Sequence, residues 1–222
     1  MSRHLQRDIE NLKNKILQMG EDVEDRVYRA TLSIVQHNEK MALDVKDNDA
    51  EIDAMEVEIE ETCLSILALY QPVAIDLRFI ITVLKINNEL ERVGDLAVNI
   101  AERSAFMALQ DEVKIPFDIT GMALKAESML TRSIDCLINM DVHLAYKIRS
   151  EDDDVDALNQ EMYARLNEAI LSNPEQINYY QHALSVGRHL ERIADHATNI
   201  AEEVIYLVDA EIVRHTPEDF VQ

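Results

Sequence analysis

The strongest constraint on the fold of this chain is an internal repeat. The segment LERVGDLAVNIAE at residues 90–102 recurs as LERIADHATNIAE at residues 190–202, with nine of the thirteen positions identical. A fainter copy pairs MALDVKDNDAEIDAM at residues 41–55 with LAYKIRSEDDDVDAL at residues 144–158. Self-similarity at a separation of about one hundred residues predicts two copies of one structural unit.

The two pairs of segments differ slightly in their separation, which is 100 residues for the later pair and 103 for the earlier one. Loops tolerate changes of length better than helices do. We therefore expect a shorter connection between the second and third helices of the second unit.

Apolar residues fall at helical spacing along almost the whole chain, and only four glycines and four prolines interrupt its 222 residues. The pattern predicts an all-α fold of two tandem, pseudo-repeated antiparallel three-helix bundles at residues 1–110 and 117–215. The segment QDEVKIPFDITG is the expected linker. The six expected helices cover residues 5–37, 39–70, 73–109, 119–140, 141–172 and 175–212.

The charge of the chain restricts its partners. Acidic side chains outnumber basic ones by 43 to 21, so the net charge is −22. This charge repels nucleic acid and anionic lipid and favours cations or a basic protein surface. Two cysteines without Cys-x-x-Cys spacing indicate neither a disulfide scaffold nor a thiolate zinc site, and the apolar runs are too short to span a bilayer. We expect a cytoplasmic protein.

Each copy of the repeat carries a stripe of acidic residues opposite its apolar stripe. If the second and third helices of each unit form an antiparallel hairpin, the acidic residues of the two helices lie at the same distance from the turn. Each hairpin is then expected to gather four carboxylates at one level. The candidate metal ligands are Asp49, Asp53, Glu91 and Asp95 in the first unit and Asp152, Asp156, Glu191 and Asp195 in the second, with Asn99 and Asn199 as further candidates.

The residues alone leave two interpretations of these stripes open. An acidic stripe is the ordinary solvated face of an amphipathic helix, and duplication copies useless features as faithfully as useful ones. On the other hand, like charges at matched height repel one another, and a bound cation would compensate for this repulsion. Oxygen ligands without thiolate suit Mg, Mn, Ca or ferric iron.

Other candidate sites are weaker. A di-iron carboxylate enzyme needs Glu-x-x-His motifs that face the bundle core, and the chain lacks this spacing. His182, His189 and His196 recur every seven residues at the edge of the apolar stripe, so we interpret them as packing or partner-facing residues. Cys63 and Cys136 have apolar neighbours and are expected to be buried.

The repeated segments resemble the PhoU family of phosphate-transport accessory proteins over essentially the whole chain. LERVGDLAVNIAE and LERIADHATNIAE are similar to the two signature helices of the family, DNDAEIDAM and EDDDVDAL to its acidic second and fifth helices, and YQPVAIDLR to the start of its third. The resemblance implies two three-helix bundles whose carboxylate motifs hold divalent or trivalent metal ions, Mg, Mn or Fe.

The resemblance also implies a function. Such a protein is a negative regulator of the phosphate-starvation response and of phosphate uptake, and it links the ATPase subunit of the phosphate importer to the phosphate-sensing histidine kinase. It is cytoplasmic, contacts the membrane only through protein partners, binds no nucleic acid, often forms a homodimer and is not an enzyme. The alternatives are a metal-dependent carboxylate-bundle enzyme and a metal-free helical interaction module.

The two motifs are not identical. His196 stands where the first copy has Leu96, and Ala194 stands where it has Gly94. The two expected metal sites therefore need not bind the same metal or bind it equally well.

Overall fold

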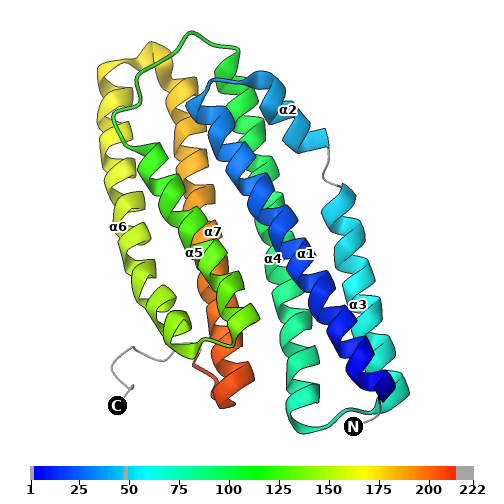
Figure 1. The fold of residues 1–222 in the computed structure, drawn as a ribbon. Coiled ribbons are helices and arrows are strands. Elements are labelled where there is room, and N and C mark those ends of the chain that lie inside the picture. Colours follow the sequence, from blue (N-terminus) through cyan, green and yellow to red (C-terminus); the bar gives the residue numbers. More distant parts are fainter. Residues whose placement is uncertain (1–2, 48–49, 214–222) are drawn as a thin grey trace.

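The computed structural model describes residues 3–47 and 50–213, and all regular elements within these ranges are helices (Figure 1). The expected all-α fold with two repeated halves is confirmed. The elements are α1 (Arg3–Val35), α2 (Glu39–Asp47), α3 (Ala50–Tyr70), α4 (Ala74–Ala108), α5 (Ile119–Asn139), α6 (Val142–Ser172), the 3₁₀ helix η1 (Pro174–Gln176) and α7 (Ile177–Asp209).

The range expected as one helix, 39–70, is occupied by α2 and α3, and residues 48–49 between them lie outside the described residues. The last helix was expected to cover 175–212, but its first turn is the 3₁₀ helix η1, and α7 ends at Asp209. Ala210 has a φ of 61°, in the left-handed region that closes a helix by directing the chain away from its axis.

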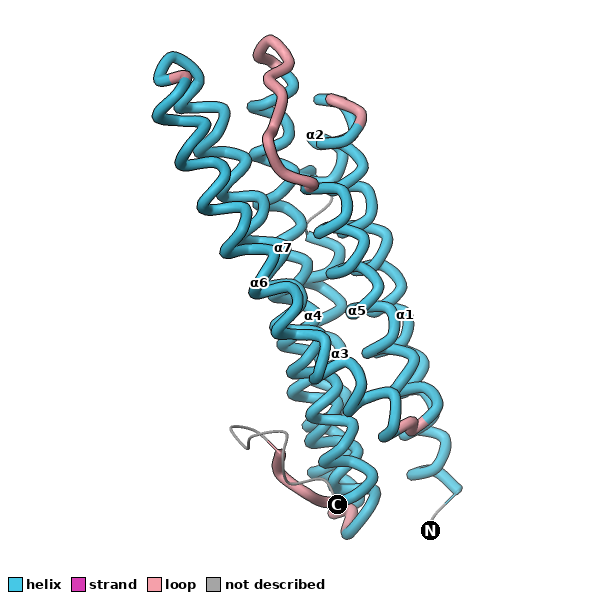
Figure 2. Tube along the Cα trace, turned by 90° about the vertical axis from the view of Figure 1, so that its left-hand side faces the viewer, coloured by secondary structure: helices cyan, strands magenta, loops and turns pink. Residues whose placement is uncertain are grey.

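The arrangement of the helices places α4 and α7 at the centre. These two helices form the most extensive contact between elements, and they run antiparallel (Figure 1). α1 packs on α4, α5 packs on α7, and α3 and α6 flank the central pair (Figure 1). Figure 2 shows that the long helices share one direction, so the molecule is elongated along the bundle. No helix within the described ranges combines the length and apolar character needed to cross a membrane.

Equivalent ion pairs confirm the register of the two hairpins. Lys46 Nζ lies 3.1 Å from Glu102 Oε1 in the first half, and Arg149 Nε lies 3.1 Å from Glu202 Oε1 in the second. Three residues separate α3 from α4, and four residues, Asn173 and those of η1, separate α6 from α7, so the second connection is not shorter when counted between the α-helices.

The core is continuous and apolar. Its large side chains include Leu12, Ile16, Ile80 and Leu130, none more than 1% exposed. The cysteines are buried as expected, and burial raises the pKa of the Cys63 and Cys136 thiols to about 12. Such thiols are almost wholly protonated at neutral pH and therefore act as small hydrophobic groups.

Gly187 allows α7 to approach α6 closely. A Cβ atom added at this position would overlap Sδ of Met162, whose side chain is fully buried. The hairpin that carries the acidic residues of the second half thus depends on a residue without a side chain at this contact.

We predict that Gly187→Val lowers the free energy of unfolding by about 1 to 3 kcal/mol, because the added side chain overpacks the α6–α7 contact. Urea denaturation measures the change. Met162→Ala removes the atoms that the valine would meet, so the double variant should be less destabilised than the sum of the two single variants. Additive losses would contradict this account of the contact.

Candidate metal centre

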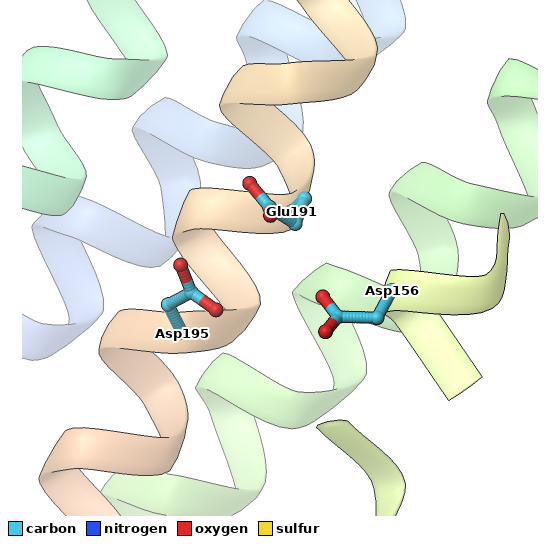
Figure 3. Close-up of side chains that lie close together, drawn as sticks. All are labelled: Asp156, Glu191 and Asp195. Carbon is cyan, nitrogen blue, oxygen red and sulfur yellow. The ribbon is translucent and has the colours of Figure 1, made fainter. Parts of the chain in front are cut away.

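Three predicted ligands meet in the second half of the chain. Asp156 comes from α6, and Glu191 and Asp195 come from successive turns of α7 (Figure 3). Each residue has a carboxylate oxygen that lies within 4.8 Å of the corresponding atoms of the other two. The i,i+4 spacing on α7 places Glu191 and Asp195 on one face, and the hairpin places Asp156 beside them.

The three carboxylates repel one another electrostatically. Burial raises the pKa of Asp195, and the negative charge of Asp156 raises it further. The pKa of Glu191 is raised by burial and then by Asp195 and Asp156. Within the described residues, no lysine or arginine forms an ion pair with any of the three. Arg188 and Arg192 are near enough to oppose the rise in the pKa of Glu191 and of Asp195, respectively, so the repulsion among the three carboxylates is only partly offset.

Asp152 borders this cluster without being part of its closest group. Its Oδ1 accepts a hydrogen bond from Thr198 Oγ1 at 3.2 Å, which orients the carboxylate toward α7. Burial, followed by the charge of Asp195, raises the pKa of Asp152 to about 6. Asp152 thus adds a fourth carboxyl group to the electrostatics of the site, on the side nearer the start of α6.

The corresponding cluster of the first half is looser. The pKa of Glu91 is raised by burial and then by the charges of Asp95, Glu56 and Asp53, so these four carboxylates lie near one another. They do not form a group as close as that of the second half among the described residues. Asp49, the remaining predicted ligand, lies outside the described residues. Glu56 was not among the predicted ligands.

The two asparagine candidates make other contacts. Asn99 Nδ2 donates to the carbonyl oxygen of Asp95 on its own helix, at 2.8 Å. Asn199 Nδ2 donates to Glu89 Oε2 on α4, at 3.0 Å. In this arrangement Asn199 connects the two halves, and Asn99 stays within one helix.

A contact between the halves was missed by the sequence analysis. His196 Nδ1 donates to Glu89 Oε2 at 2.6 Å, and His196 is only 7% exposed. Burial tends to raise the pKa of Glu89, but the hydrogen bonds from His196 and Asn199 outweigh it and hold the pKa below its usual value. The seven-residue spacing placed His196 at the edge of the core, but no local signal identifies a partner 107 residues away.

The ligand set of the second half fits a hard cation. Six-coordinate Mg or Mn binds oxygen at about 2.1 Å, which places oxygens of one coordination shell about 3 to 4 Å apart. The carboxylates of Asp156, Glu191 and Asp195 approach this separation, and none of the three forms an ion pair with a lysine or arginine within the described residues. Oxygen-only ligation favours Mg, Mn or ferric iron over structural zinc.

Comparisons with known proteins identify the same family in both halves. The profile of the PhoU domain matches residues 16–104 and 119–204. A phosphate-specific transport system accessory protein, the PhoU homolog of Aquifex aeolicus, is 39% identical over 209 residues, which cover 94% of this chain and 95% of that protein. The homolog of Clostridium acetobutylicum is 35% identical over 202 residues, with coverage of 90% and 92%.

Two crystal structures are similar over nearly the whole chain. PhoU from Pseudomonas aeruginosa gives a TM-score of 0.89 at 32% identity, covering 93% of this chain and 99% of that one. The phosphate transport system regulatory protein PhoU from Streptococcus pneumoniae gives a TM-score of 0.84 at 27% identity, covering 94% and 99%.

We predict that the metal-free protein becomes less stable as the pH rises from about 4 to about 6.5. The pKa of Asp152 is raised to about 6 in the folded state, and burial raises the pKa values of Glu191 and Asp195 above their usual range. The folded state therefore holds these protons more tightly than the unfolded chain does. Asp152→Asn should flatten this slope. At pH 7 it should raise the melting temperature by about 2 to 4 °C for each kcal/mol of repulsion removed.

Thermal unfolding in the presence of a chelator, followed by circular dichroism, measures this effect. Glu168→Gln is the matched control because Glu168 is an exposed acid on the same helix and lies outside the cluster. Equal slopes in wild type and Asp152→Asn would show that the cluster does not govern the pH dependence.

Proposed function

Because this chain belongs to the PhoU family, we propose that it is a negative regulator of phosphate uptake and of the phosphate-starvation response. It would act as an adaptor between the ATPase subunit of the phosphate importer and the phosphate-sensing histidine kinase. The observation that carries this proposal is the similarity to phosphate-specific transport system accessory proteins across both halves of the chain.

An adaptor acts through contact surfaces rather than through a reaction. The names of the relatives describe an accessory protein and not an enzyme. The elongated bundle has long helical faces for such contacts (Figure 2). With a net charge of −22, it would meet basic surfaces of its partners in the cytoplasm and approach the membrane only through them. We also propose a homodimer as its assembly, and no nucleic-acid partner.

The carboxylate clusters have a supporting role in this proposal. A Mg, Mn or Fe ion bound by Asp156, Glu191 and Asp195 would hold α6 and α7 at a fixed spacing and remove the repulsion among the three. The first half would bind a second ion through its own carboxylates. Metal binding would in this way fix the shape of the surface that the partners meet.

We predict that the Asp156→Asn/Asp195→Asn variant loses the metal of the second half and keeps its helicity, because these exposed side chains bind the ion without supporting the core. Metal analysis by mass spectrometry after desalting, together with circular dichroism, measures both properties. The control is Asp153→Asn/Glu168→Gln, which changes two exposed acids of α6 outside the cluster. Equal metal content in both variants would remove this site from the proposal.

The adaptor role is tested by affinity purification of the tagged chain from phosphate-replete cells, with quantitative mass spectrometry. The importer ATPase and the histidine kinase should be enriched with the wild type. Both should be depleted at least tenfold with Asp156→Asn/Asp195→Asn if metal shapes the contact surface. Enrichment of neither partner with the wild type would overturn the adaptor proposal.

A further inference from the structure

The contact between α4 and α7 has an approximate twofold symmetry. The two helices are antiparallel, and residue n of α4 corresponds to residue n+100 of α7 in the repeat. Each contact near one end of this pair therefore has an equivalent near the other end.

The residues compared between the two ends belong to one stripe of each helix along this line. They are Lys85, Glu89, Arg92, Leu96, Asn99, Arg103 and Phe106 on α4, and His182, Ser185, His189, Arg192, His196, Asn199 and Glu203 on α7.

One end of this line has balanced charges, and we call it the paired end. Lys85 Nζ lies 3.0 Å from Glu203 Oε2, and Glu203 is only 4% exposed. Next to this pair, Glu89 accepts hydrogen bonds from His196 and Asn199. The carboxylates at this end come from both helices, and each has a donor within hydrogen-bonding distance.

At the other end, bases replace these acids, and we call it the cationic end. The repeat equivalent of Glu203 is Arg103, the equivalent of Glu89 is His189, and the equivalent of Lys85 is Ser185. Two carboxylates of the paired end are thus an arginine and a histidine here. The two ends of the contact therefore carry side chains of different charge at equivalent positions of the repeat.

Several nitrogen atoms of the cationic end lack partners among the described residues. Nε of Arg103 is buried and forms no hydrogen bond, and the nearest acidic group to its guanidinium is Glu102, the preceding residue, at 4.0 Å. Nδ1 of His182 and Nδ1 of His189 are also buried without a partner. Buried polar atoms in proteins are nearly always hydrogen-bonded, so three such nitrogen atoms at one place are unusual. Nε of Arg103 can only donate, so this atom requires an acceptor, whereas each histidine Nδ1 can donate or accept according to its tautomer.

These groups lie close together. Arg103 acts electrostatically on both His182 and His189, and Arg188 and Arg192 act on His189 as well. The His182 ring stacks on Phe106 of α4, with ring centroids 3.9 Å apart. Arg188 and Arg192 are exposed and form no ion pair within the described part of the chain. Arg188 also acts on Glu191, and Arg192 also acts on Asp195, so these two arginines lie between the carboxylate cluster and the cationic end, and Arg103 is the arginine nearest both histidines.

We propose that the cationic end binds an oxyanion, and that the oxyanion is inorganic phosphate. The planar guanidinium of Arg103 can donate two parallel hydrogen bonds to phosphate oxygens, which a lysine cannot do. His189 supplies a further donor from α7. Ser185 Oγ now donates to the carbonyl oxygen of Gln181 at 3.1 Å and can rotate toward a phosphate oxygen instead. Arg188 and Arg192 surround the site with positive charge.

The existence of an oxyanion site follows from the contacts of α4 and α7 alone. The identification of the anion as phosphate rests on the proposed function, in which the chain takes part in phosphate regulation. A phosphate at this position would bridge the two halves of the chain where the paired end is bridged by Lys85–Glu203. Binding would thereby stiffen the central helix pair and relay the phosphate level to the partner surfaces.

The test is calorimetric titration of sodium phosphate into the protein at pH 7.5 and constant ionic strength. The protein is the chelator-treated wild type, titrated with chelator present, so that phosphate cannot bind through a metal ion. We expect saturable binding with one site per chain. Arg103→Gln in this background should weaken binding at least tenfold, and Arg103→Lys should weaken it less, because it keeps the charge but loses the two parallel donors.

The matched control is the Lys85→Gln/Glu203→Gln pair, which removes the charges at the paired end and should leave phosphate binding unchanged. Thermal unfolding of each variant checks that the fold persists. No binding of phosphate at up to about 10 mM by the parent protein, or equal binding after Arg103→Gln, would overturn the proposal. Sulfate titrated in the same way separates the two claims, because equal affinity for sulfate supports an oxyanion site and overturns its assignment to phosphate.

The outcome is independent of the adaptor experiment. If phosphate binds as expected but the partners are not enriched, the proposed function fails and the oxyanion site stands. If the partners are enriched but phosphate does not bind, this inference fails and the adaptor proposal stands.

Discussion

The antiparallel packing of α4 against α7 is the contact on which the remaining structure depends. It joins the third helix of one repeat to the third helix of the other, and it is the most extensive contact between elements. Polar contacts along the same line fix the axial register of the two helices. Glu203 is nearly inaccessible to solvent, so any shift in register would leave its carboxylate buried without Lys85, at a cost of several kcal/mol.

This contact also determines what the other helices can do. α1 and α5 cover the central pair, while α3 and α6 lie at its flanks and carry acidic residues beside those of α4 and α7 (Figure 1). In the second half, Gly187 lets α6 approach α7, and Asp156 then lies beside Glu191 and Asp195. The carboxylates lie close together because the apolar contact between α6 and α7 sets the spacing of the two helices. The stability gained from this apolar contact offsets the repulsion among the carboxylates.

The duplication has produced two similar units that now differ in useful ways. The carboxylates of the second cluster lie closer to one another than those of the first cluster do. In the first cluster, Glu56 lies beside the carboxylates that were expected from the repeated acidic stripe. Along the α4–α7 line, an acid at one end corresponds to a base at the other, as in Glu203 and Arg103. The apolar contacts hold the bundle together in both halves, whereas several polar positions differ between the two halves.

The sequence by itself determined the helical class, the duplication, and the register within each hairpin. These features depend on short-range periodicity and on one tight turn, so Lys46 meets Glu102 and Arg149 meets Glu202 as the repeat requires. The meeting of Asp156 with Glu191 and Asp195 was predictable for the same reason. Only the tertiary structure decided which faces of α4 and α7 meet, and therefore that His196 bonds Glu89 and that Arg103 lacks a carboxylate of α7. Such pairings join residues about a hundred positions apart, and they follow from how whole helices pack rather than from any local pattern.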